Sequence, residues 1–123
     1  MFAKSFTVPI TTAADGTGSG FTDVTNGRVL GVVYVPDGTT PFANNVVVTI
    51  TTEVSLQAVM TKTVAAGNTA FSAYPKVQNN AVADASAIAG AFDFIPLAGN
   101  ERVKIAIASG GDTKSGSFMV IVG

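Results

Sequence analysis

The side chains that most often carry out enzyme chemistry are missing from this sequence. It contains no histidine and no cysteine, which removes the commonest general base, the commonest metal ligand and the thiolate nucleophile. Ser-His-Asp triads, Cys-His pairs and most zinc sites are therefore excluded. A chain without cysteine also has no disulfide framework, which is typical of proteins that fold in a reducing cytoplasm.

Any catalysis would have to use carboxylates, lysines or hydroxyl groups. Asp93 with Glu101, and Asp112 with Lys114, are the pairs whose spacing suits acid-base chemistry. Paired catalytic carboxylates need a cleft that separates their pKa values, whereas carboxylates in Gly- or Asn-containing turns usually have a solvated structural role. The glycines at 110–111 precede no strand-to-helix transition, so they do not indicate a phosphate-binding loop. We predict no enzyme activity and no cofactor.

The segment 15–20 is the part of the sequence most similar to a metal-binding loop. Asp15 and Ser19 could supply oxygen ligands to Ca²⁺. Calcium loops use several carboxylates, and this segment contains one. The three glycines within it are typical of turns instead. We therefore predict a structural loop and no metal site.

The charge pattern favours association with proteins. Only 12% of the residues are charged and the net charge is −1, while 47% of the residues are hydrophobic. Ordinary domains carry about 25% charged residues, and a net charge near zero favours association. The seven Lys and Arg are scattered, so no basic surface for nucleic acid is expected. This composition predicts a subunit of a larger assembly.

Targeting signals are not evident in the sequence. No apolar run approaches the roughly 20 residues that a membrane span needs, so no membrane partner is expected. The opening residues 1–6 lack the apolar stretch of a signal peptide. We expect synthesis in the cytoplasm.

The hydrophobic pattern predicts an all-β fold. Short apolar runs alternate with clusters of Gly, Asn, Asp and Pro, which is the spacing of an antiparallel β-sandwich, jelly-roll-like or immunoglobulin-like. The length suits a single domain covering residues 1–123. Residues 65–100 form an irregular, loop-rich insertion in which the alanine-rich segment 82–91 predicts at most one short helix.

Individual strands and hairpins can also be predicted. Pro9 cannot donate to a β-ladder, which places the first strand at an edge, and the run 28–35 is apolar on both faces, as in a central strand. Asn-Gly at 26–27 predicts a hairpin leading into that run. Two further hairpins are expected, joining 46–52 to 56–64 and 102–108 to 117–122.

Aromatic residues in loops are the candidates for contact with partners. Such side chains either fold back to cap the ends of a sandwich or anchor a protein interface. Tyr34 belongs to the predicted core strand, whereas Tyr74 lies beside a proline in a loop. A sugar-binding module is a weaker alternative, because the usual stacking platform is Trp and this chain has none. The candidate interface residues are Phe2, Phe6, Phe42, Phe71, Tyr74, Phe92 and Phe94.

Parts of the sequence resemble a known class of virion protein. Residues 101–118 running into 120–123, the opening segment 6–12 and the strand 27–35 look like small proteins encoded beside the capsid genes of tailed bacteriophages, the cement or decoration proteins. The matching residues are strand and turn residues that carry no chemistry. Residues 65–100 have no counterpart in this resemblance.

The resemblance implies a structural role on a virus particle. It suggests a dimer or trimer on the outer capsid surface of the virion, bridging and stabilising subunits of the major capsid protein. A tail or fibre module is an alternative of the same class. A carbohydrate-binding β-sandwich displayed on the particle is the other alternative.

Overall fold

The computed structural model describes residues 3–74, 76–78, 87–92, 95–97 and 99–123, with the backbone alone described for 76–78, 87–92 and 95. All regular structure in these residues is β-strand, as the sequence predicts. The strands are β1 (Lys4–Thr11), β2 (Gly18–Phe21), β3 (Arg28–Pro36), β4 (Val46–Thr52), β5 (Ala58–Val64), β6 (Phe71–Ala73), β7 (Lys76–Gln78), β8 (Ala87–Phe92), β9 (Ile95–Pro96), β10 (Val103–Ala108) and β11 (Ser115–Val122).

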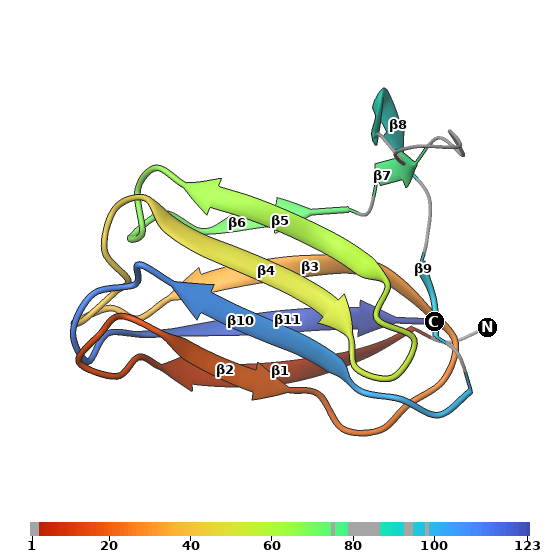
Figure 1. Cartoon of the computed structure of the whole chain (residues 1–123), viewed down its shortest axis with the longest axis horizontal. Coiled ribbons are helices and arrows are strands. Elements are labelled where there is room, and N and C mark those ends of the chain that lie inside the picture. Colours follow the sequence, from red (N-terminus) through yellow and green to blue (C-terminus); the bar gives the residue numbers. More distant parts are fainter. Residues whose placement is uncertain (1–2, 75, 79–86, 93–94, 98) are drawn as a thin grey trace.

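Two antiparallel sheets pack face to face (Figure 1). The first sheet has the strand order β1-β11-β3-β6, and the short β9 also pairs with β3. The second sheet has the order β2-β10-β4-β5. Strands β7 and β8 pair with each other as a separate two-stranded ribbon. The predicted β-sandwich is therefore confirmed.

The strand order is that of a jelly roll. Four antiparallel pairs are nested along the chain, β1 with β11, β2 with β10, β3 with β6 and β4 with β5. These nested pairs amount to one long hairpin whose tip is the β4–β5 turn. When this hairpin wraps on itself, β11 pairs with β3 and β10 pairs with β4, which gives the observed order of both sheets. Of the two sandwich types expected, the structure selects the jelly roll.

Several details of single strands follow the sequence. In β1, Val8 and Ile10 are buried while Pro9 faces outward, and β1 lies at the edge of its sheet. Strand β3 lies between β11 and β6, as its apolar faces predict. The hairpin of β4 and β5 is confirmed.

The other two predicted hairpins are wrong, because their strands lie in different sheets. The segment 26–27 joins β2 of one sheet to β3 of the other, and the loop 109–114 likewise joins β10 to β11. Gly27 does adopt the positive φ that the pattern suggested, 111°, but it does so in a crossing connection. An alternating pattern fixes which face of a strand is buried, not which strand becomes its neighbour.

The predicted short helix is also corrected. Residues 87–92 form strand β8, whose partner is β7, and residues 82–86 lie outside the described part of the chain. Helix propensity of alanine is a weak preference that pairing with another strand overrides. No helix in the described residues is long and apolar enough to span a membrane.

The core lies between the sheets and contains an aromatic cluster. The rings of Tyr34 and Phe118 have centroids 5.1 Å apart, and Phe42 stacks on Tyr34 at 5.8 Å. Gly116 makes this packing possible, because a Cβ atom there would lie 2.7 Å from the Phe42 ring and 2.8 Å from the Tyr34 ring. Aliphatic residues of all the long strands complete the core: Val8, Ile10, Val29, Val32, Val46, Val48, Ile50, Val59, Val64, Val103, Ile105, Ile107, Val120 and Val122.

The connections gather at two ends of the sandwich (Figure 1). One end, which we call the Phe42 end, lies at the left of the figure. It carries the loops 12–17, 37–45, 65–70 and 109–114. The opposite end, the Glu101 end, carries the loops 22–27, 53–57 and 99–102.

Candidate functional site

The predicted interface aromatics that the structure describes fall into two groups. Phe42 is 2% exposed and belongs to the core, while Phe71 and Phe6 are partly buried against it. The Lys62 amine lies 5.0 Å from the centre of the Phe71 ring and covers its outer side. These three rings therefore serve the packing of this chain, which corrects the expectation that Phe42 offers a surface to a partner.

Tyr74 differs from those aromatics because its side chain is 60% exposed. It packs over Gly31 of β3, where a Cβ atom would lie 3.2 Å from the tyrosine ring. Tyr74 is thus available for contact, as the sequence suggests. Phe2 and Phe94 lie outside the described residues, and Phe92 is described only as backbone of β8.

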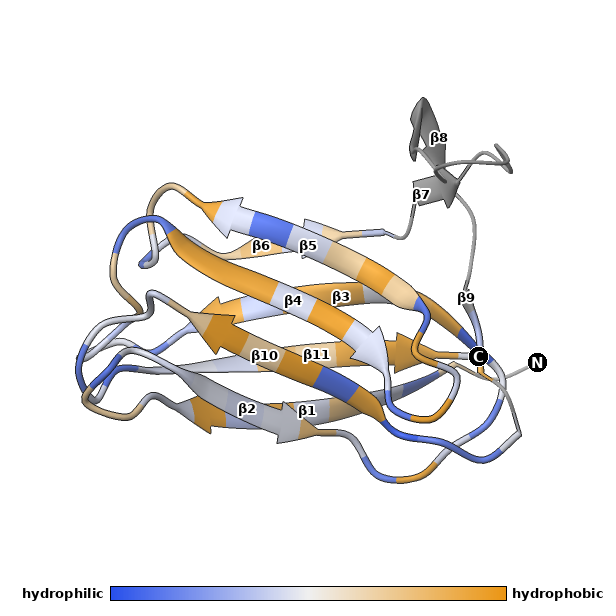
Figure 2. Ribbon diagram, viewed as in Figure 1, coloured by the Kyte–Doolittle hydropathy of each residue, from blue (hydrophilic) through white to orange (hydrophobic). Residues whose placement is uncertain are grey.

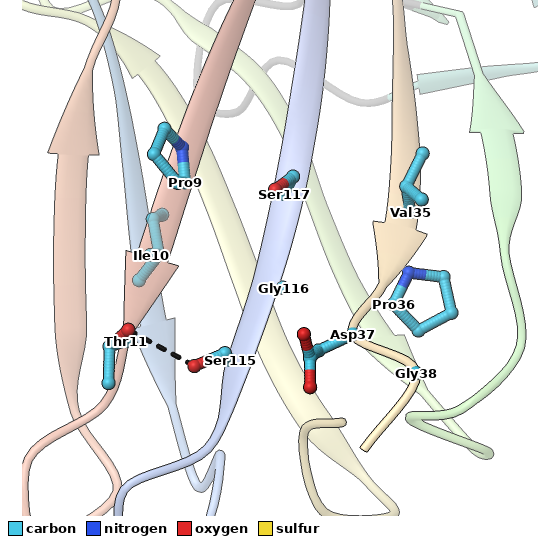
Figure 3. A pocket seen from close by; sticks show the side chains of 10 residues that line it. All are labelled: Pro9, Ile10, Thr11, Val35, Pro36, Asp37, Gly38, Ser115, Gly116 and Ser117. Atoms are coloured by element: carbon cyan, nitrogen blue, oxygen red, sulfur yellow. Dashed lines mark hydrogen bonds between the residues drawn. The ribbon is translucent and has the colours of Figure 1, made fainter. Parts of the chain in front are cut away.

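A hollow of about 350 Å³ lies on the outer side of the first sheet, at the Phe42 end (Figure 3). Strand β1 contributes Pro9 and Thr11, strand β11 contributes Ser115 and Ser117, and the end of β3 with the following loop contributes residues 35–38. The hydroxyls of Thr11 and Ser115 are hydrogen-bonded across the two strands at 3.1 Å. The hollow therefore offers hydroxyl groups between small apolar surfaces.

Asp37 is the ionisable residue in this hollow. Its Oδ2 atom accepts hydrogen bonds from the amides of Thr39 and Thr40, at 3.0 and 2.7 Å, and from the Thr40 hydroxyl. These bonds stabilise the ionised form and hold the pKa of Asp37 below its ordinary value. A lone, fully ionised carboxylate can accept hydrogen bonds from a polar ligand, but it has no second group in the hollow's lining with which to perform acid-base catalysis.

Among the described residues, the most deeply buried carboxylate lies at the opposite end of the sandwich. Glu101 is 1% exposed, and its Oε1 atom accepts hydrogen bonds from the amides of Val54 and Ser55, at 2.9 and 3.0 Å. Its Oε2 atom accepts a bond from the Ser55 hydroxyl at 2.9 Å. On its other side, the Glu101 backbone exchanges two hydrogen bonds with Thr25. A single residue therefore joins the β4–β5 turn to the β2–β3 loop.

The β4–β5 turn has further hydrogen bonds of its own. The Thr52 hydroxyl is bonded to the Ser55 hydroxyl at 2.8 Å and accepts the amide of Gln57 at 2.8 Å. The Gln57 side-chain amide donates to Ser55 and to the carbonyl of Pro96. Within this turn Leu56 has a φ of 57°, a left-handed conformation that is costly for a bulky side chain.

Three large aliphatic side chains point to solvent at this end. Leu56 is 75% exposed, Val54 68% and Val24 61%. Figure 2 shows hydrophobic segments in the β4–β5 turn and in the β2–β3 loop. We refer to Val24, Val54 and Leu56 as the apolar tip. Sequence reasoning overlooked it, because isolated apolar residues in polar turns give no periodic signal.

An ion pair borders the apolar tip. Arg102 donates through both Nε and Nη2 to the carboxylate of Glu53, with the Nη2–Oε1 distance 2.6 Å. The arginine also stacks on the Phe21 ring, 4.1 Å from its centre. The hydrogen bonds from Arg102 hold the pKa of Glu53 below its ordinary value. Both side chains remain partly exposed, so the pair orders the surface more than it stabilises the fold.

The described carboxylates that the sequence singled out at Asp112 and Asp15 make local hydrogen bonds. Asp112 accepts a hydrogen bond from the hydroxyl of its neighbour Thr113, and Asp15 accepts two from Thr17 in a local turn. Asp93 lies outside the described residues. Within the described chain, no three acidic residues approach one another closely enough to hold a metal ion.

Comparison with protein-family models, with curated proteins and with solved structures found no match for this chain. The function therefore has to be inferred from the residues and their arrangement.

Proposed function

We propose that this protein is a structural subunit of a bacteriophage virion, a cement or decoration protein that binds the outer capsid surface and bridges subunits of the major capsid protein. The observation that carries the proposal is a jelly roll whose exposed aliphatic side chains are concentrated at one end, on a body of low charge. Jelly rolls are common among viral capsid domains. That parallel concerns the fold, and the sequence resemblance adds independent support.

The mechanism would be stabilisation by mass action. A subunit that binds the assembled shell more tightly than its separated parts shifts the equilibrium toward the shell. The effect is multiplied over many copies, so each contact can be modest. A low net charge limits repulsion between neighbouring copies on the same surface.

Co-sedimentation tests this proposal. Capsids that lack the protein should take it up in a fixed ratio to the major capsid protein and should then resist heat better. Capsids that already carry a full complement provide the control, because they should take up no more. The proposal fails if bare capsids bind none of it. Size-exclusion chromatography of the free protein tests the expected dimer or trimer.

A second candidate function is carbohydrate binding, and the hollow beside Asp37 is the observation that favours it. Hydroxyl groups and an ionised carboxylate are suitable partners for sugar hydroxyls, and jelly rolls also occur in lectins. The hollow has no aromatic ring on which a sugar could stack, which makes this candidate the weaker one. Binding to glycans that is abolished by Asp37→Ala, together with failure to bind capsids, would favour it. Uptake by purified tails and not by capsids would instead identify a tail or fibre module.

A further inference from the structure

We propose that the apolar tip, formed by Val24, Val54 and Leu56, is a preorganised anchor that inserts into an apolar pocket on another protein. This inference rests on the proposed function and deepens it, since the partner would then be a protein of the virion shell. Three independent features of the Glu101 end lead to it: the exposure of the tip, its rigid support and its backbone strain.

The exposure of the tip is the first feature. Isolated exposed apolar residues are ordinary, but here three large aliphatic side chains lie on two loops that one residue connects. Glu101 is bonded through its backbone to Thr25, next to Val24, and through its carboxylate to the amide of Val54. The two loops that carry the three side chains are thus connected through Glu101 at the same end of the sandwich.

The rigid support is the second feature. A carboxylate that is 1% exposed is costly to bury unless its oxygens are hydrogen-bonded. Here Glu101 is used to fix the turn that carries Val54 and Leu56. An anchor held in its bound conformation loses less conformational entropy when it binds. A turn held in this way is better suited to binding another protein than to serving only as a solvent-exposed connection between β4 and β5.

The backbone strain is the third feature. Leu56 has a left-handed conformation that asparagine or glycine would adopt at lower cost. A leucine at such a position stabilises neither the turn nor the core, because it is 75% exposed. Residues held in unfavourable conformations are concentrated at functional sites. We infer that Leu56 is present for a contact outside this chain.

The charges around the tip favour a protein partner over a membrane. The loops 22–27 and 53–57 contain two charged residues, Asp23 and Glu53, and both are acidic. The neighbouring Arg102 is paired with Glu53. Binding to an anionic lipid surface requires basic residues near the inserted side chains, and these loops have none.

The hollow on the first sheet of a second copy does not complement the tip. The tip needs an apolar pocket, whereas the hollow on the first sheet is lined by the Asp37 carboxylate and by hydroxyls of Thr11, Ser115 and Ser117. The complementary surface is therefore expected on a different protein, as a pocket with apolar walls and a neutral or basic rim.

The test compares capsid binding and stability for two tip variants. Leu56→Asn removes the apolar side chain and suits the left-handed backbone. Val54→Thr keeps the shape of the side chain and the backbone bond to Glu101. We expect each to weaken binding to capsids at least tenfold, while Leu56→Asn melts at the same temperature as the unmodified protein or higher. Thr63→Ser is the control, because Thr63 is exposed near the end of β5 that lies away from the tip, and it should bind normally.

The outcomes separate the two proposals. If the unmodified protein and Leu56→Asn bind capsids equally, the anchor is wrong and the proposed function stands. If Thr63→Ser weakens binding as much as the tip variants do, the loss is not specific to the tip and the anchor is again wrong. Binding to vesicles of anionic lipid that Leu56→Asn abolishes would assign the tip to a membrane and overturn a protein partner. If the unmodified protein binds no capsid, the proposed function fails and the anchor fails with it.

Discussion

The two ends of this jelly roll differ in where the apolar side chains of their loops point, into the core at one end and into solvent at the other. At the Phe42 end, the aromatic ring of the long β3–β4 loop turns inward and joins Tyr34 and Phe118 in the core. At the Glu101 end, the buried group is a carboxylate, and Val54 and Leu56 turn outward. If the loops at the Glu101 end served only the stability of the fold, we would expect their apolar side chains to point into the core, as Phe42 does. The difference between the ends is what points to a contact surface at the second.

The comparison can be tested most strongly at Phe42. We expect Phe42→Ala to lower the free energy of unfolding by about 3–5 kcal/mol, because it leaves a cavity beside the rings of Tyr34 and Phe118. Urea denaturation measures this value. Phe42→Leu is the control and should lose less, since it keeps most of the volume. A small loss for Phe42→Ala would contradict a core role for this ring.

The next largest effect is expected at Glu101. Glu101→Ala removes the acceptor of three hydrogen bonds and should cost about 2–4 kcal/mol of unfolding free energy. Glu101→Gln keeps an acceptor for the turn amides and should cost less. Hydrogen exchange of the Val54 and Ser55 amides should accelerate more in the alanine variant. Equal stability of the two variants would mean that the carboxylate does not hold the turn.

Tyr34 provides a smaller test at the Phe42 end. Its hydroxyl donates to the carbonyl of Gly67 at 2.5 Å, which connects the core to the β5–β6 loop. We expect Tyr34→Phe to cost about 1 kcal/mol, the usual contribution of a buried hydrogen bond. Tyr74→Phe is the matched control, and thermal unfolding should not change for it because Tyr74 is largely exposed.

Leu56 should respond in the opposite direction. Relief of the left-handed leucine conformation is expected to make Leu56→Asn more stable by about 0.5–1 kcal/mol. Val54→Asn, at a neighbouring residue without a positive φ, should bring no such gain. Denaturation curves of both variants decide this. A destabilised Leu56→Asn would show that the leucine serves the fold and would remove the strain argument for the anchor.

The smallest effect concerns pH and the loop containing Asp37. Since the pKa of Asp37 is lowered in the folded protein, its carboxylate stabilises the fold at pH values above its ordinary pKa, and this contribution is lost as the pH falls through the lowered pKa. Asp37→Ala should therefore lower the melting temperature slightly at neutral pH, and the difference should vanish once the pH has fallen through the lowered pKa and the carboxyl is protonated. A difference that persists in acid would contradict this assignment.

The sequence was sufficient to predict the long strands but not all of their partners, and it did not predict the short strands β6 to β9 within residues 65–100. Alternation in residues 102–108 and 117–122 correctly identifies buried faces, and those strands exist as β10 and β11. Their assignment to opposite sheets depends on how the whole hairpin wraps, which involves residues far away in the sequence. The hairpin of 46–52 was predictable because its turn is short and its two strands stay in one sheet.

The candidate site was harder to predict, and the reasons are physical. Glu101 stands between asparagine and arginine, a polar setting that suggests exposure, yet it is buried because the backbone amides of a distant turn need an acceptor. Phe42 stands in a Pro- and Asn-rich loop, which suggests a surface position, yet it packs in the core because Gly116 leaves space for it. Both outcomes depend on contacts between residues far apart in the sequence, and a local sequence pattern does not predict such contacts. The exposure of Tyr74 agrees with its position in a loop.

The position of β11 has a consequence for biosynthesis. It lies between β1 and β3 and pairs with both along most of its length, so until residues 115–122 have been synthesised β1 lacks its neighbour in this sheet and β3 can pair only with the short β6 and β9. Assembly of the first sheet must therefore wait until translation has reached this strand, and it then requires contacts between distant parts of the chain, which form slowly. During that interval, nascent chains would expose unpaired strands, and their yield should depend on temperature and on chaperones.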